Sequence, residues 1–170
     1  VSGASPEPVR RLLDSRRRVD PGAEVERARR LGVRLVTPVD PDYPDPLRRL
    51  YDPPLALYLR GTLEPDDRRA VAIVGSRHTT GYGREIASAF AWQLARDGWT
   101  IVSGLARGID TRAHQGALQA DGGRTLAVLG GGLHDLYPPE NRELAESITA
   151  HGALVTEFPL GREPDRTTFP

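Results

Sequence analysis

The sequence predicts an α/β fold, a Rossmann-like parallel sheet with helices on both faces, preceded by a short helical N-terminal segment. From Ala70 onward, short apolar runs rich in β-branched residues alternate with segments of helical periodicity. A glycine follows each of the first three apolar runs, as expected where a strand turns tightly into a helix. The alternation predicts parallel strands joined by right-handed crossovers. Because the strands are parallel, all of these turns lie at one edge of the sheet.

The first 60 residues differ in composition from the rest of the chain. A proline after Ser5 and another after Asp20 predict the starts of two small helices, whose outer faces carry many arginines. We interpret these faces as solvated and keep a nucleic-acid-contacting patch as the alternative. Repeated proline between the apolar runs 33–37 and 55–59 predicts an extended connector.

The central βαβ unit begins with residues 71–74, which predict a strand buried on both faces because the run is continuously apolar. Ile86, Phe90 and Leu94 then recur at helical spacing, with three alanines beside them. This spacing predicts a helix whose apolar stripe packs on the sheet. Residues 99–103 predict the second strand.

The remaining elements follow in the same alternation. Asp110 is placed to act as the N-cap of a helix over 111–120. Residues 125–129 predict the third strand, 140–150 a helix and 153–156 the fourth strand. Doubly wound sheets usually carry more strands than these four, so we expect this domain to be incomplete at its C-terminus.

These elements divide the chain into three parts. Residues 1–40 are expected to be the end of a small helical N-terminal domain, and residues 41–69 an extended connector with its boundary in the polar stretch 61–69. Residues 70–170 are expected to form the Rossmann-like domain. The chain starts without methionine, so we expect it to be a piece of a longer protein.

Composition limits the function classes. The net charge is zero at pH 7, so any nucleic-acid affinity must come from a local patch. All 23 basic residues are arginine, which gives every cationic contact a forked geometry. Cysteine is absent, and the four histidines lack metal-ligand spacing, so we interpret them as surface or capping residues. No apolar run is long enough to span a membrane, and we expect a soluble cytoplasmic protein without metal or cofactor.

Polar side chains directly follow two of the predicted strands. Ser76 and Arg77 come after the first strand, and Arg107 lies in the glycine turn after the second. Ligands of open α/β sheets bind at this edge, where helix N-termini and arginines suit an anion, above all phosphate. For single residues the alternatives stay open. Ser76 is equally suited to forming a turn, and Arg107 is equally suited to pairing near Asp110.

Two common nucleotide-binding motifs are absent. The dinucleotide fingerprint fails because the glycines after the first strand have the wrong spacing, and the second strand does not end in an acid. A Walker A loop is excluded because the chain contains no lysine. No activated nucleophile or placed carboxylate pair is evident, so we expect no enzymatic activity.

Several ordered motifs together resemble the DNA-processing protein A (DprA, or Smf) family. They are the VGSR sequence at 74–77, SGLARGID at 103–110 followed by Ala113-His114, Gly132 ahead of Tyr137-Pro138 and Asn141, and EFP at 157–159. The resemblance covers roughly residues 43–170. It implies a Rossmann-like domain that binds and protects single-stranded DNA, forms a homodimer and helps to load RecA recombinase in natural transformation, with no enzymatic activity and no membrane association.

The resemblance also implies which residues bind DNA. A glycine-serine-arginine turn holds DNA phosphate, and neighbouring glycine turns form the walls of the pocket. The matching residues here are Gly75, Ser76, Arg77, Gly104, Arg107, Gly108 and Gly132. One departure is Pro139, which stands where many relatives carry a lysine after the Tyr-Pro motif.

Two other function classes stay open. The first is a nucleotide-processing enzyme on a related fold, such as a phosphoribohydrolase. The residues after Gly132 are Leu133, His134 and Asp135, so the catalytic glutamate of that enzyme class is not where its motif would place it. The second is a non-catalytic module that binds a small nucleotide. Titration with a labelled oligonucleotide and with mononucleotides distinguishes these classes.

Overall fold

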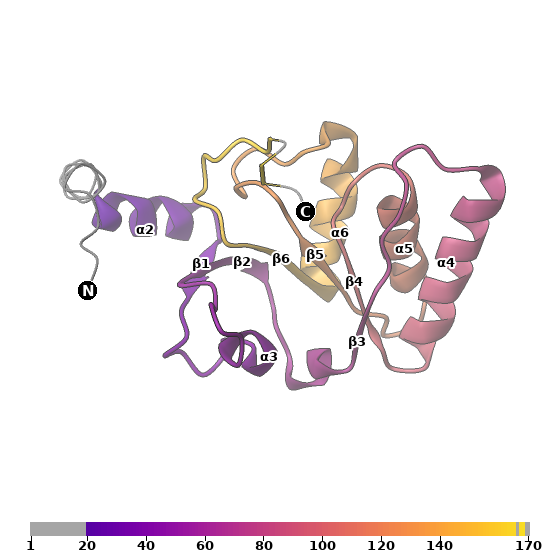
Figure 1. Ribbon diagram of the computed structural model, residues 1–170, viewed down its shortest axis with the longest axis horizontal. Coiled ribbons are helices and arrows are strands. Elements are labelled where there is room, and N and C mark those ends of the chain that lie inside the picture. Colours follow the sequence, from indigo (N-terminus) through magenta and orange to yellow (C-terminus); the bar gives the residue numbers. More distant parts are fainter. Residues whose placement is uncertain (1–19, 166, 169–170) are drawn as a thin grey trace, which may run out of the picture.

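The computed structural model describes residues 20–165, 167 and 168, and contains a six-stranded sheet flanked by helices (Figure 1). The strands, in the spatial order β1-β2-β6-β5-β4-β3, are β1 (Arg34–Val36), β2 (Leu57–Gly61), β3 (Ala70–Ala72), β4 (Thr100–Ser103), β5 (Thr125–Val128) and β6 (Gly152–Thr156). The helices are α2 (Pro21–Arg30), α3 (Asp45–Arg48), α4 (Gly81–Arg96), α5 (Ile109–Leu118) and α6 (Arg142–His151), with short 3-10 helices η1 (Pro65–Arg68) and η2 (Pro139–Asn141). The helix predicted after Ser5 lies outside the described residues.

The parallel half of the sheet is formed by β3, β4, β5 and β6, as the alternating sequence pattern predicts. Helices α4, α5 and α6 connect these strands and lie along this half of the sheet (Figure 1). The predicted α/β class is confirmed. Because the strands are parallel, the turns that follow β3, β4 and β5 lie at one edge.

The sheet also has an antiparallel half, which differs from the predicted extended connector. Strand β2 pairs with β6 over Tyr58 to Gly61, and β1 pairs with β2. The prolines do keep most of the intervening segment irregular, but the apolar run at Leu57 enters the sheet. Leu57 and Leu59 pack on one face and Tyr58 on the other, so pairing with β6 buries side chains on both faces. The domain division itself stays a prediction.

Strand β3 is less buried than the sequence predicts. Ala70 and Ala72 are exposed, and Val74, just beyond the strand, is 70% exposed. The reason is that β3 is the edge strand of the described sheet, with a hydrogen-bonded neighbour on one side only. A continuous apolar run therefore did not indicate burial on both faces here.

Helix α4 buries only part of the predicted apolar stripe. Phe90 is 61% exposed, whereas the buried positions are Ala87, Ala91 and Ala95. These alanines allow α4 to pack closely against α5, where a Cβ added to Gly116 would overlap the backbone of α4. Close helix packing thus selected the small residues over the large ones.

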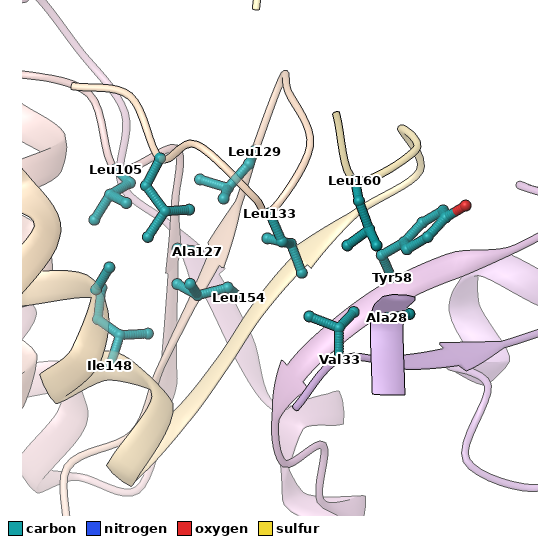
Figure 2. Packing of buried hydrophobic residues seen from close by; sticks show 12 residues of the cluster. Ala28, Val33, Tyr58, Leu105, Ala127, Leu129, Leu133, Ile148, Leu154 and Leu160 are labelled. Carbon is teal, nitrogen blue, oxygen red and sulfur yellow. The ribbon is translucent and has the colours of Figure 1, made fainter. Parts of the chain in front are cut away.

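The largest core cluster extends beneath the turns at the carboxyl ends of the strands. Figure 2 shows Leu105 and Leu129, from two neighbouring turns, in the same buried cluster as Leu154 from β6. Leu133 and Leu160 extend this cluster toward α2. Buried leucines within the turns themselves therefore anchor the edge where the predicted site lies.

At the opposite end of the strands, Arg124 ties η1 to the sheet. Its guanidinium donates to both carboxylate oxygens of Asp67, at 3.0 and 2.9 Å, and to Glu64 at 2.8 Å. Burial alone would raise the pKa of Asp67, but hydrogen bonds from Arg124, the Glu64 amide and Thr100 together lower it. The predicted boundary segment is thus held firmly against β4 and β5.

Candidate functional site

The turns after β3 and β4 interlock through glycine. Gly108 has a φ of +83°, and a Cβ at this position would overlap the carbonyl oxygen of Ser76. The same Ser76 carbonyl accepts a hydrogen bond from the Ile109 amide at 3.3 Å. A Cβ on Gly75 would lie 2.8 Å from the Ile109 side chain. Side chains at either glycine would therefore push the two turns apart.

The carboxylate of Asp110 holds the backbone of the turn after β4. It accepts hydrogen bonds from the Gly104 amide at 3.1 Å and the Ala106 amide at 3.4 Å. The predicted N-cap role of Asp110 is wrong, because α5 begins at Ile109 with Gly108 as its cap residue. The side chain of Asp110 reaches back into the turn, so the Gly104 and Ala106 amides already have an acceptor.

The side chain of Asn141 holds the same turn through the Leu105 carbonyl. Leu105 is buried and has a φ of +61°, a conformation that non-glycine residues adopt only where their surroundings impose it. The Asn141 side-chain amide donates to the Leu105 carbonyl at 2.8 Å and to the Thr111 hydroxyl at 2.9 Å. This role of Asn141 was not predicted from the sequence, where its place after the Tyr-Pro motif was the available signal.

Ser76 forms its own turn. Its hydroxyl donates to the His78 carbonyl at 2.8 Å and accepts from the His78 amide at 3.1 Å. This is the turn-forming alternative, and it leaves the residue exposed at the surface. A ligand that bound the Ser76 hydroxyl would have to share it with this turn.

Arg77 and Arg107 line one small cavity of about 20 Å³. Gly104, Tyr137 and Pro138 complete most of its wall. Two arginines from different turns therefore line one depression at the carboxyl edge of the sheet. Such an arrangement suits a phosphate group, because the guanidinium fork matches its oxygens.

Arg107 is paired with Glu140, not with the region of Asp110. Its Nε and Nη2 atoms donate to the two carboxylate oxygens of Glu140, with the second bond at 3.1 Å. Its Nη1 donates to the Tyr137 hydroxyl at 3.2 Å, and the guanidinium carbon lies 5.5 Å from the centre of the Tyr137 ring. The hydrogen bond with Glu140 raises the pKa of Arg107 and lowers that of the carboxyl group.

Gly132 lies on the neighbouring wall. Its amide donates to the Arg162 carbonyl at 2.8 Å, and a Cβ there would overlap the carbonyl oxygens of Pro159 and Leu160. Gly132 and Gly104 both line a second cavity of about 20 Å³, beside the first. The seven predicted site residues thus lie on adjoining turns at one edge of the sheet, with several glycines serving the packing of those turns.

His114 differs from its predicted surface or capping role. It is fully buried in α5, and its Nδ1 lies 2.7 Å from the Thr125 hydroxyl. Among the described residues, no group of three His, Cys, Asp or Glu side chains is placed to hold a metal ion. In the same part of the chain, none of the helices has the length and apolar character that crossing a membrane requires.

Comparison with protein families gives a match over most of the chain. The family model described as DNA recombination-mediator protein A matches residues 34–170. Protein Smf from Synechocystis sp. is 38% identical over 174 residues, which cover 100% of this chain and 44% of that protein. DNA processing protein DprA from Bacillus subtilis is 36% identical over 143 residues, covering 84% of this chain and 48% of the relative. The chain therefore spans about half the length of these relatives.

Two solved structures share the fold. The X-ray structure of DNA processing protein A from Streptococcus pneumoniae matches with a TM-score of 0.77 and 32% identity, over 93% of this chain and 54% of that one. DNA processing protein A from Helicobacter pylori, studied for its single-stranded DNA binding mode, matches with a TM-score of 0.69 and 30% identity, over 80% and 61%.

Proposed function

The chain belongs to the DNA recombination-mediator protein A family, and from this premise we propose that it binds single-stranded DNA at the edge of the sheet formed by the glycine turns, without catalysing a reaction. The observation that carries the proposal is that Arg77 and Arg107 line one cavity at that edge. Family membership supplies the ligand class, and the paired arginines supply the chemistry for phosphate.

The proposed division of labour follows from the contacts. Arg77 is the main phosphate contact, because it lies in the turn that follows β3 and lines the cavity. Gly75, Gly104, Gly108 and Gly132 act by keeping the turns close together. Ser76 shapes its own turn through its hydrogen bonds with the His78 backbone. The Gly104 amide serves Asp110, so recognition depends more on guanidinium groups than on free backbone donors.

Contacts to phosphate carry little sequence information, so we propose weak sequence preference. In its full-length parent, we propose that the protein acts as a cytoplasmic homodimer that protects incoming DNA and helps to load RecA recombinase in natural transformation. These further roles derive from the family resemblance and accompany the DNA-binding proposal.

Fluorescence anisotropy with a labelled oligothymidylate tests the proposal. Each phosphate neutralised on a single strand contributes about 0.7 to the log–log salt slope, so a few arginine contacts are expected to give a slope of about two to four. Binding that does not respond to salt would exclude a phosphate site.

Arg77→Ala is expected to weaken binding by about 1.5 to 3 kcal/mol, the range for a hydrogen bond to a charged group. Arg77→Lys should recover only part of the loss, since a point charge replaces a fork. The matched control is Arg96→Ala, which removes the same charge at the far end of α4, roughly 20 Å along the helix from its first residue. Equal affinities for Arg77→Ala and Arg96→Ala would place the DNA site elsewhere.

The same variants test the alternative nucleotide-processing function. Purified protein is expected to leave both mononucleotides and oligonucleotides intact. Hydrolysis that persists in the Arg96→Ala control and disappears with Arg77→Ala would favour an enzyme over a DNA-binding mediator.

A further inference from the structure

We propose that Glu140 is a built-in competitor of single-stranded DNA for Arg107, and that it thereby limits the affinity of the site. The inference rests on the proposed function, because it concerns how the same edge of the sheet is regulated. It follows from the way in which one carboxylate occupies the donors that a phosphate would need.

All three nitrogens of Arg107 are already engaged. Nε and Nη2 face the two oxygens of Glu140, and Nη1 faces the Tyr137 hydroxyl. A phosphate binds arginine through the same pair of parallel N–H groups that a carboxylate uses. Glu140 and a DNA phosphate therefore cannot both take the fork of Arg107 in its present orientation.

The Arg107–Glu140 pair is open to exchange. Both side chains are 49% exposed, so water and salt reach the pair and its net strength is that of a surface ion pair. A phosphate that enters the cavity also meets Arg77 on its wall. The incoming group thus gains a second cation beside Arg107.

The backbone keeps Glu140 close to Arg107. The next residue, Asn141, is 6% exposed and donates to the buried turn at Leu105 and to Thr111. The carboxylate is therefore tethered beside the cavity, and DNA binding must displace the side chain and not the segment. When a DNA phosphate binds Arg107, the Glu140 carboxylate is left as a negative charge next to the bound DNA.

Glu140→Gln tests this competition, since the amide keeps the shape and removes the charge. We expect oligothymidylate binding at low salt to tighten about two- to fivefold, the factor corresponding to an exposed ion pair. The log–log salt slope should steepen by up to about 0.7, because the Glu140 carboxylate no longer offsets one cationic contact beside the bound DNA.

Glu146→Gln is the matched control. Glu146 lies in α6, is 52% exposed and pairs with Arg60 at 2.6 Å, so its substitution removes the same charge and breaks an equivalent ion pair away from the cavity. We expect its affinity and salt slope to equal those of the wild type. Thermal melts of both variants verify that the fold is retained.

Arg107→Ala separates competition from simple repulsion. If Glu140 acts by occupying Arg107, Glu140→Gln should tighten binding less in the Arg107→Ala background than in the wild type. A gain of equal or greater size in that background would overturn the proposal. So would a Glu140→Gln variant that binds DNA as the wild type does or more weakly, because the carboxylate would then position Arg107 for binding.

Failure of the inference is distinguishable from failure of the proposed function. If Arg77→Ala weakens DNA binding while Glu140→Gln changes nothing, the DNA site stands and the competition is refuted. If neither the wild type nor Glu140→Gln binds the oligonucleotide, both proposals fail.

Discussion

Acidification from pH 8 to pH 5 is expected to destabilise the fold through His114. The ring is fully buried, and burial lowers its pKa to about 3. Because the Thr125 hydroxyl donates to the Ile101 carbonyl at 2.8 Å, it accepts from Nδ1 of the histidine. Nε2 has no hydrogen-bond partner among the described residues, so a proton placed there would be a buried, unpaired charge.

The sign follows from proton linkage. Above the ordinary histidine pKa of about 6.5, neither the folded nor the unfolded state binds this proton. Between that pKa and the folded-state value, the unfolded chain is protonated and the folded chain is not, so the free energy of unfolding falls as the pH falls. At pH 5, about 1.5 units below the ordinary pKa, the loss is about 2 kcal/mol. This figure depends on the unfolded-state pKa, since pH 5 lies well above the folded one.

Urea unfolding followed by circular dichroism at pH 8, 6.5 and 5 measures this loss. The comparison variant is His114→Asn, whose amide can still donate to Thr125 but does not titrate. We expect the wild type to lose about 2 kcal/mol more than the variant between pH 8 and pH 5, or roughly 4 to 8 °C in melting temperature. Groups that titrate in both proteins cancel in this difference.

An independent measurement is the ring titration of His114 by NMR in the folded protein. The resonance is expected to stay that of a neutral ring down to pH 5. A ring that titrates near pH 6.5 in the folded state, or equal pH dependence in wild type and His114→Asn, would refute the reasoning.

Three further substitutions test the packing of the turns and helices. Gly116→Ala should lower stability by about 1 to 3 kcal/mol, because its Cβ overlaps the backbone of α4, and a urea titration measures this. Gly108→Ala should weaken both stability and oligonucleotide binding, since it drives Ser76 away from the next turn and strains a positive φ. Asn141→Ala should lower stability by about 1 to 3 kcal/mol in the same titration, because it leaves the Leu105 carbonyl without its donor.

Each of the two glycine substitutions has a control elsewhere in the chain. A Cβ at Gly81 would lie no closer than 3.9 Å to the nearest contacting atom, so Gly81→Ala should leave stability unchanged where Gly116→Ala lowers it. Gly32→Ala has a φ of +66° but nothing within 4 Å, so it isolates the backbone strain of Gly108→Ala. Equal losses in either pair would mean that the overlap has no energetic effect.

Much of the fold was readable from the sequence because it depends on local pattern. β-branched runs, helical spacing and glycine breaks predicted the four parallel strands and the helices between them. The same pattern did not distinguish an edge strand from a central one, because Val71 looks alike whether or not a neighbour covers it. It also did not show which residues of the α4 stripe are buried. Ala91 is buried and Phe90 is exposed because α5 packs closely against α4.

The sequence by itself determined that the candidate site residues share one edge of the sheet, since glycine turns after parallel strands must lie at the same edge. Only the tertiary structure decided the partners: Asp110 reaches back to the Gly104 turn, and Glu140, 33 residues away in sequence, takes Arg107. The physical reason is that spacing along the chain determines backbone geometry within a few residues. Hydrogen bonds and ion pairs between distant side chains depend on which of them the packed core brings within reach.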